Sequence, residues 1–173
     1  MKKIYKIVTV LFLSLTLTSC LNEWLTVNPK TDMTRDILFS TESGFKDALT
    51  GVYIQLKNSA GYGENLTMTT LEYLVSSWDV TTNTTQQRLT QFLYTDAGVE
   101  GVMSSIFSQH YSVIASINAI LDQIDGKKDL FTTDKMYELV KGEALALRAL
   151  CHLDVLRLFG PVPSVTNDDN ILP

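Results

Sequence analysis

Few side chains in this 173-residue sequence have the types and spacing needed for acid–base or metal chemistry. The two histidines, His110 and His152, are candidate zinc ligands on two different helices, since imidazole nitrogen is a preferred zinc ligand. No acidic residue stands at a ligand spacing beside either, because Asp154 falls on a different helical face from His152. Two partly buried helix histidines are the alternative. Glu143 is a candidate general acid, but no second carboxylate or base converges on it. The sequence therefore predicts no catalytic residue, no metal site and no cofactor.

Cys20 points to a different chemistry, which is covalent attachment of lipid. An apolar run over residues 7–18 is too short to span a bilayer and leads into Leu17-Thr18-Ser19-Cys20. Three lysines form a cationic head before it: Lys2, Lys3 and Lys6. This arrangement is typical of a bacterial lipoprotein signal, so we predict a signal peptide over residues 1–19 and acylation of Cys20. More than one acyl chain would anchor the mature protein stably to a membrane. The alternative is an uncleaved anchor or a simple secretory signal, in which Cys20 is incidental.

The charge and the cysteines of the mature chain exclude several classes. Removing residues 1–19 takes three of the 14 basic residues and none of the 19 acidic ones, so 11 − 19 leaves a net charge of −8. So acidic a domain is a poor candidate for binding nucleic acid or anionic headgroups. With Cys20 acylated, Cys151 has no disulfide partner and is predicted to pack as a small apolar residue. The sequence also lacks the Gly-x-Ser-x-Gly motif of a hydrolase.

Apolar periodicity predicts an all-α mature domain that begins after a tether. Residues 20–40 lack a sustained period and are predicted to be a lipid-anchored tether, or else a strap that packs on the domain. The four helices that follow run from the Thr41 cap to about Leu56, from about Glu64 to Ser77, from about Val99 to Ile124, and from Thr133 or Asp134 to Gly160. The polar, threonine-rich stretch from Asp79 to Gln87 is predicted to be an exposed loop.

The fourth predicted helix carries apolar residues around nearly its whole circumference between Leu139 and Phe159. A helix of that kind is expected to be buried on all sides, yet the three helices before it supply only part of that cover. Stacked helix hairpins need about three repeats before the core closes, and two hairpins are present. We therefore expect an incomplete stack, with residues 164–173 as a linker or truncated end.

Four motifs stand in order along the chain. They are Gly51-Val52-Tyr53, Ile114-x-x-x-Asn118, Gly142-Glu143-Ala144-x-x-x-Arg148-Ala149 and Phe159-Gly160-x-x-Pro163. Together with the Leu-x-Ser-Cys ending of the signal, they resemble the amino-terminal signature of the SusD/RagB family, the nutrient-binding outer-membrane lipoproteins of Bacteroidetes. The resemblance covers residues 17–163, and it identifies residues 41–163 as a SusD-like amino-terminal helical domain.

The resemblance implies a right-handed stack of tetratricopeptide-like antiparallel helix pairs, anchored in the cell outer membrane and facing the exterior. Such proteins lie over a SusC-like, TonB-dependent transporter and pass glycan or peptide ligands to it without covalent chemistry. Family members are several hundred residues long, so this chain corresponds to their amino-terminal part. The alternatives are a small helical-repeat scaffold lipoprotein of the envelope, a truncated remnant without function, and a lipid-anchored enzyme.

Two sets of residues are the candidates for function and for packing. The starch-binding relatives present part of an aromatic platform after their second helix, which makes Trp78, Asp79 and Asn83 the candidate ligand-binding residues: the indole would stack on a sugar ring and the polar groups would bind its hydroxyls. The alternative is that Trp78 is the last core residue of the second helix. Glu143, Arg148 and Asn118 are predicted to form a structural network between helices.

Overall fold

The computed structural model describes residues 34–161, and this part of the chain contains helices and no strand. The elements are α2 (Arg35–Leu38), α3 (Glu42–Leu56), α4 (Thr70–Leu74), α5 (Thr85–Thr90), α6 (Ala97–Ile124), the 3₁₀ helix η3 (Asp125–Leu130) and α7 (Met136–Phe159). The predicted all-α fold is confirmed. The signal peptide, Cys20, the tether up to residue 33 and the segment 164–173 lie outside the described residues. No helix in the described range combines the length and the apolar character that crossing a membrane requires.

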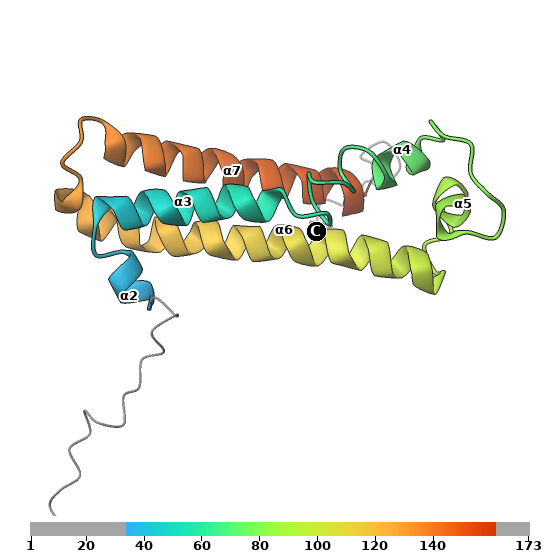
Figure 1. The fold of residues 1–173 in the computed structure, drawn as a ribbon, viewed down its shortest axis with the longest axis horizontal. Coiled ribbons are helices and arrows are strands. Elements are labelled where there is room, and N and C mark those ends of the chain that lie inside the picture. The colour runs from blue at the N-terminus through green and yellow to red at the C-terminus, as the bar shows by residue number, and fades with distance from the viewer. Residues whose placement is uncertain (1–33, 162–173) are drawn as a thin grey trace, which may run out of the picture. The chain divides into compact units, whose positions relative to one another are not determined.

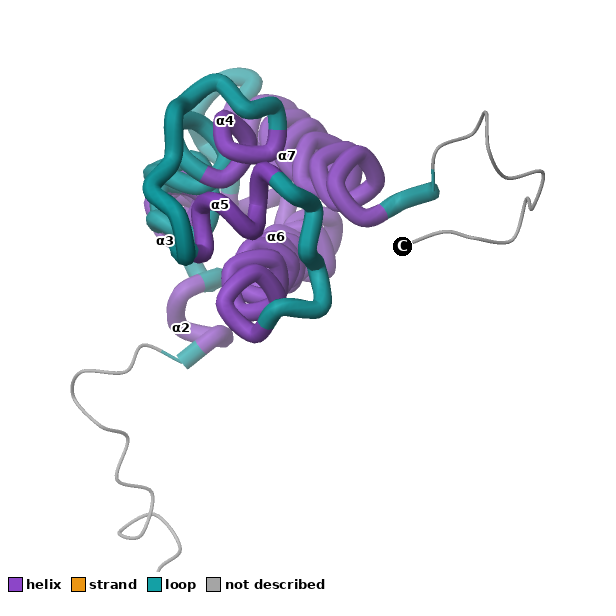
Figure 2. Tube along the Cα trace, turned by 90° about the vertical axis from the view of Figure 1, so that its right-hand side faces the viewer, coloured by secondary structure: helices purple, strands orange, loops and turns teal. Residues whose placement is uncertain are grey.

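Three long helices, α3, α6 and α7, lie side by side, and α6 runs in the opposite direction to the other two (Figure 1). The connection from α3 to α6 carries the short helices α4 and α5, which sit together at one end of the bundle. That end faces the viewer in Figure 2. The segment from α3 to α6 is therefore the least regular part of the described fold.

The first long helix begins where the sequence predicts. Thr41 has an extended backbone, and its Oγ1 accepts a hydrogen bond from the Gly44 amide at 3.1 Å, which satisfies one of the free donors of the first turn. A Cβ added at Gly44 would lie 1.6 Å from the Leu38 carbonyl oxygen. Glycine at position 44 therefore lets α2 turn tightly into α3.

The core lies between the three long helices and extends to Phe39, between α2 and α3. Phe39, at the end of the range predicted as tether, is 2% exposed, and its ring lies 4.9 Å from that of Phe45, which lies 5.1 Å from Phe131. The other fully buried apolar side chains include Val52, Val113, Ile117, Ile120, Ile124, Val140, Ala144 and Cys151. Residues before Thr41 thus contribute to the packed part of the chain.

The second predicted helix is wrong in extent, since α4 covers five residues only. The Asn65 side chain accepts hydrogen bonds from the hydroxyls of Thr69 (3.1 Å) and Thr70 (2.9 Å), and such local bonds offer the backbone an alternative to a helix. Ser76, with φ of 56°, is left-handed just after α4. The predicted loop also contains an unexpected helix, α5, which Thr84 caps by accepting from the Gln87 amide at 3.2 Å.

The expectation that the last helix is buried on all sides is wrong. In α7 only one face is covered, with Val140, Ala144, Leu147, Cys151 and Val155 buried. The leucines elsewhere on α7 are substantially exposed: Leu139 52%, Leu145 41%, Leu150 39%, Leu153 49% and Leu156 44%. The physical reason is that α3 and α6 contact α7 from one side, and the α3–α4 loop reaches it only near its carboxyl-terminal end, around Asp154.

Candidate ligand-binding site

A hollow of about 430 Å³ lies where α4 leads into α5. Its walls come from α4, from the loop that follows it and from the start of α5; the lining residues are Tyr73, Trp78, Asp79, Val80, Thr81, Thr84 and Gln86. Two of the three residues predicted to bind ligand, Trp78 and Asp79, therefore line one concave surface.

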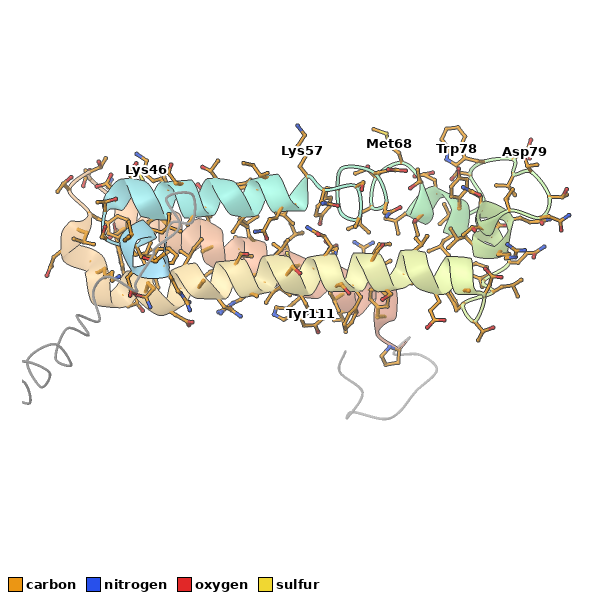
Figure 3. All side chains as sticks on the ribbon, turned by 60° about the horizontal axis from the view of Figure 1, so that its bottom comes forward. Lys46, Lys57, Met68, Trp78, Asp79 and Tyr111 are labelled. Atoms are coloured by element: carbon orange, nitrogen blue, oxygen red, sulfur yellow. The ribbon has the colours of Figure 1, made fainter. Side chains whose placement is uncertain are left out.

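Trp78 presents its indole to solvent. The side chain is 57% exposed, and Figure 3 shows Trp78 and Asp79 pointing away from α6, on the same side of the molecule as Lys57 and Met68. The interpretation of Trp78 as the last core residue of the second helix is wrong, because α4 ends at Leu74 and the left-handed Ser76 redirects the chain before Trp78.

The polar groups of the hollow divide into those already bonded and those available. The Thr84 hydroxyl donates to the Thr81 carbonyl oxygen at 2.7 Å and caps α5. The side chains of Tyr73, Asp79 and Gln86 also line the hollow, and together with the indole N–H of Trp78 they are groups that can hydrogen-bond to the hydroxyls of a ligand.

Asn83 does not line the hollow. It has a left-handed backbone, with φ of 60°, and its amide donates to Gln87 Oε1 at 2.8 Å, so that it shapes the turn into α5. Tyr73 and Gln86, which do line the hollow, were not among the residues singled out from the sequence. Gln86 lies in the polar stretch that the sequence marks as exposed, but no local pattern distinguishes it from its neighbours.

The chemistry of the hollow is aromatic and largely uncharged. Its lining contains one carboxylate, that of Asp79, and no lysine or arginine. An aromatic face can stack on the apolar face of a sugar ring, while carboxylate and amide groups accept or donate hydrogen bonds to hydroxyls. This lining suits a polyhydroxylated neutral ligand better than an anionic one.

The residues predicted to form a structural network lie on the bundle, outside the hollow. Arg148 Nη1 donates to Asn118 Oδ1 at 3.0 Å, from α7 to α6. Glu143 Oε2 accepts from the Tyr53 hydroxyl at 3.0 Å, from α3 to α7. Tyr53 is 47% exposed rather than part of the apolar stripe of its helix. Burial, and then the hydrogen bond to Glu143, raises the pKa of Tyr53, so its hydroxyl stays protonated and donates.

The two histidines lie in different surroundings. His110 is 2% exposed and faces Asp154, an acidic residue that sequence spacing does not connect with it. His152 is exposed, and its ring lies 6.5 Å from that of Tyr111. Within residues 34–161, no group of three His, Cys, Asp or Glu side chains is arranged to hold a metal ion.

Comparison with known proteins shows which family the chain belongs to. Residues 23–171 match a family model described as "starch-binding associating with outer membrane". The match covers most of the chain, which therefore belongs to the SusD-like family, and the resemblance read from the sequence motifs is confirmed. The chain is also 27% identical over 171 residues to "SusD-like protein P25" of Formosa agariphila, an alignment that covers 95% of this chain and 32% of that relative. The chain thus spans about a third of the length of the curated relative it matches. No solved structure matches it.

Proposed function

We propose that this protein is a lipid-anchored outer-membrane protein that captures glycan oligomers at the hollow beside Trp78 and delivers them to a SusC-like, TonB-dependent transporter. The observation that carries the proposal is the exposure of Trp78, whose indole is 57% accessible at the rim of a hollow lined by hydrogen-bonding groups. Membership of a family described as starch-binding and associated with the outer membrane supports it.

The expected binding mode is stacking combined with hydrogen bonding. The Trp78 indole supplies a flat apolar surface for one face of a sugar ring, which is worth about 1 kcal/mol beyond the burial of area. Asp79 accepts from ring hydroxyls, and Gln86 both donates and accepts. Because the hollow is open, each sugar unit is held weakly, and an oligomer that spans several units binds better than a monosaccharide.

Equilibrium titration with a panel of neutral oligosaccharides, anionic oligosaccharides and short peptides tests the proposal. We expect the wild-type protein to bind at least one neutral oligosaccharide, and Trp78→Ala to weaken that binding by about tenfold. Phe92→Ala is the matched control, because Phe92 is 55% exposed but does not line the hollow. Equal titrations for wild type and Trp78→Ala would exclude Trp78 from the site, and binding of peptides alone would replace glycan as the ligand class.

The lipid anchor and the transporter are tested separately. Cys20→Ser is expected to move the protein from the outer-membrane fraction to the soluble fraction, and mass spectrometry of the wild type is expected to show acyl chains on Cys20. Affinity purification of the wild type from outer membranes is expected to recover a TonB-dependent transporter. Recovery of other envelope proteins without a transporter would favour the small scaffold lipoprotein instead.

A further inference from the structure

His110 occupies an unusual position between α6 and α7. Its side chain is 2% exposed, and its Nδ1 lies 2.8 Å from the carbonyl oxygen of Ile106, one turn earlier in α6. Its Nε2 is fully buried and makes no hydrogen bond within residues 34–161, and Asp154 Oδ2 lies 3.6 Å from it. Both ring nitrogens therefore face acceptor oxygens.

A neutral imidazole cannot satisfy both contacts. It carries one N–H, so whichever tautomer forms, one ring nitrogen turns a lone pair towards an oxygen. With Nδ1 donating to the Ile106 carbonyl, Nε2 meets the Asp154 carboxylate without a proton between them. The imidazolium donates from both nitrogens and pairs its charge with Asp154, and an ion pair whose partners are both hydrogen-bonded is tolerated in a buried position.

Asp154 also connects this pair to the loop between α3 and α4. The Tyr62 hydroxyl donates a hydrogen bond to Asp154 Oδ2, the same oxygen that faces His110. Burial, followed by the bond to Asp154, raises the pKa of Tyr62, so its hydroxyl keeps its proton and remains the donor. A single carboxylate oxygen thus links α6, α7 and the loop.

The other titratable and charged groups around the pair do not supply the proton that is absent between a neutral His110 Nε2 and the Asp154 carboxylate. Cys151 on α7 is buried, and burial, then Asp154, raises the pKa of its thiol to about 11. Arg157 lies at the rim of the neighbouring hollow, which Tyr62 and Asp154 also line, and it is exposed. From α3, the contact next to His110 is uncharged: Gln109 Nε2 donates to the Gln55 carbonyl oxygen at 2.7 Å.

The loop that Tyr62 belongs to is compact and leads directly to the candidate ligand site. Its amides bond internally, with Tyr62 donating to Leu56, Leu66 to Gly61 and Met68 to Glu64, at 2.9 to 3.0 Å. Thr70 is buried and starts α4, which carries Tyr73 into the wall of the hollow. The way the loop rests on α7 therefore affects where that wall stands.

We propose that His110 is held as the imidazolium and that its pairing with Asp154 is a proton-dependent latch, which fixes the α3–α4 loop on α7 through Tyr62. In the protonated state the carboxylate accepts from both His110 and Tyr62. When Nε2 loses its proton, its lone pair faces the Asp154 carboxylate and repels it. Asp154 then moves away from His110, and this movement strains its hydrogen bond with Tyr62. The stabilisation is present while the imidazole is protonated and is lost as the pH rises through release of that proton.

Nitrogen NMR of the ¹⁵N-histidine-labelled full chain tests the protonation state. At about pH 7, where an ordinary imidazole is mainly neutral, both His110 nitrogens are expected to give imidazolium shifts. His152→Gln assigns the signals and serves as the control. Neutral shifts for His110 at this pH would overturn the proposal.

Hydrogen exchange, corrected for the intrinsic rate at each pH, tests the latch. Protection of the Tyr62, Leu66 and Met68 amides relative to those in the middle of α6 is expected to fall by about tenfold between about pH 6 and about pH 9. Asp154→Asn keeps an acceptor for Tyr62 but removes the charge, so it is expected to make His110 neutral and the loop protection independent of pH. Retention of the imidazolium in Asp154→Asn, or loop protection that does not change with pH in the wild type, would refute the latch.

Discussion

Arg148 Nη1 lies 3.0 Å from Asn118 Oδ1, so a guanidinium on α7 donates to a side-chain amide on α6. Each residue belongs to one of the motifs on which the family resemblance rests. Both side chains are partly buried, and neither lies near the hollow beside Trp78. The motifs thus record how two long helices pack, whereas the proposed ligand site lies in the less regular segment between α3 and α6.

Replacing Arg148 by leucine is expected to lower stability without changing ligand binding. The substitution removes a charge-assisted hydrogen bond that is partly open to solvent, which is worth about 1 kcal/mol. The melting temperature is expected to fall by roughly 3 °C. Arg148→Lys is the control, because lysine keeps the charge without the planar geometry and is expected to restore only part of the loss. An unchanged melting temperature for Arg148→Leu would contradict the packing role.

Glu42 is expected to make the fold sensitive to acid. Its Oε2 accepts from the amides of Thr132 (2.8 Å) and Thr133 (3.0 Å), which fastens the start of α3 to the segment before α7. Hydrogen bonds from the side chain and then the backbone of Thr133, with those of Thr132, lower the pKa of Glu42 to about 2.

Because the folded state binds the Glu42 proton less tightly than the unfolded state, the stabilisation is complete above the unfolded value of about 4.5 and is lost as the pH falls towards about 2. Thermal melts over this window are expected to fall less steeply for Glu42→Gln than for the wild type. Glu64→Gln serves as an exposed control outside this contact. Parallel profiles for wild type and Glu42→Gln would show that the contact contributes nothing.

The long helices could be predicted because their signals are local. The spacing of apolar residues around Phe45 and Ile117 identifies a helix without knowledge of its partner, and Thr41 and Gly160 mark ends that the structure confirms. The segment from residue 57 to residue 96 was harder, because side-chain bonds from Asn65 and a left-handed Ser76 decide its path. Such competition between side chain and backbone leaves no periodic pattern.

The candidate site was predictable only in part, because residue type is visible in the sequence and the path of the chain at Ser76 is not. Trp78 and Asp79 stand out by residue type, but whether the indole is buried or exposed depends on the turn at Ser76. The pairing of His110 with Asp154 depends on the register of α6 against α7, which neither helix encodes alone. For that reason the sequence could place Asp154 only on a different helical face from its neighbour His152, and could not connect it with His110.

The Cys151 thiol is expected to be unreactive towards thiol reagents in the folded protein. Its side chain is fully buried, and burial raises the pKa of the thiol to about 11, so little thiolate is present at neutral pH. In a Cys20→Ser variant, Cys151 is the one remaining cysteine. Its reaction with a maleimide is expected to be at least about a hundredfold slower in buffer than in denaturant. Rapid labelling under native conditions would show that α7 separates from the bundle.

The exposed apolar face of α7 is expected to bind other apolar surfaces when the chain is isolated. Exposed leucines on one helix form an apolar surface of a kind that soluble monomers rarely present. We therefore expect the folded protein to bind a fluorescent hydrophobic dye and to self-associate. Leu153→Ser is expected to reduce both effects with little change in melting temperature, because Leu153 is 49% exposed.

Val155→Ser, two residues further along α7, is the matched comparison. Val155 is 1% exposed, so the substitution removes buried apolar contacts and places a hydroxyl in the core. It is expected to lower stability by about 1 to 3 kcal/mol and to increase dye binding. If Leu153→Ser lowered the melting temperature as much as Val155→Ser does, the outer face of α7 would have to be covered within the folded chain.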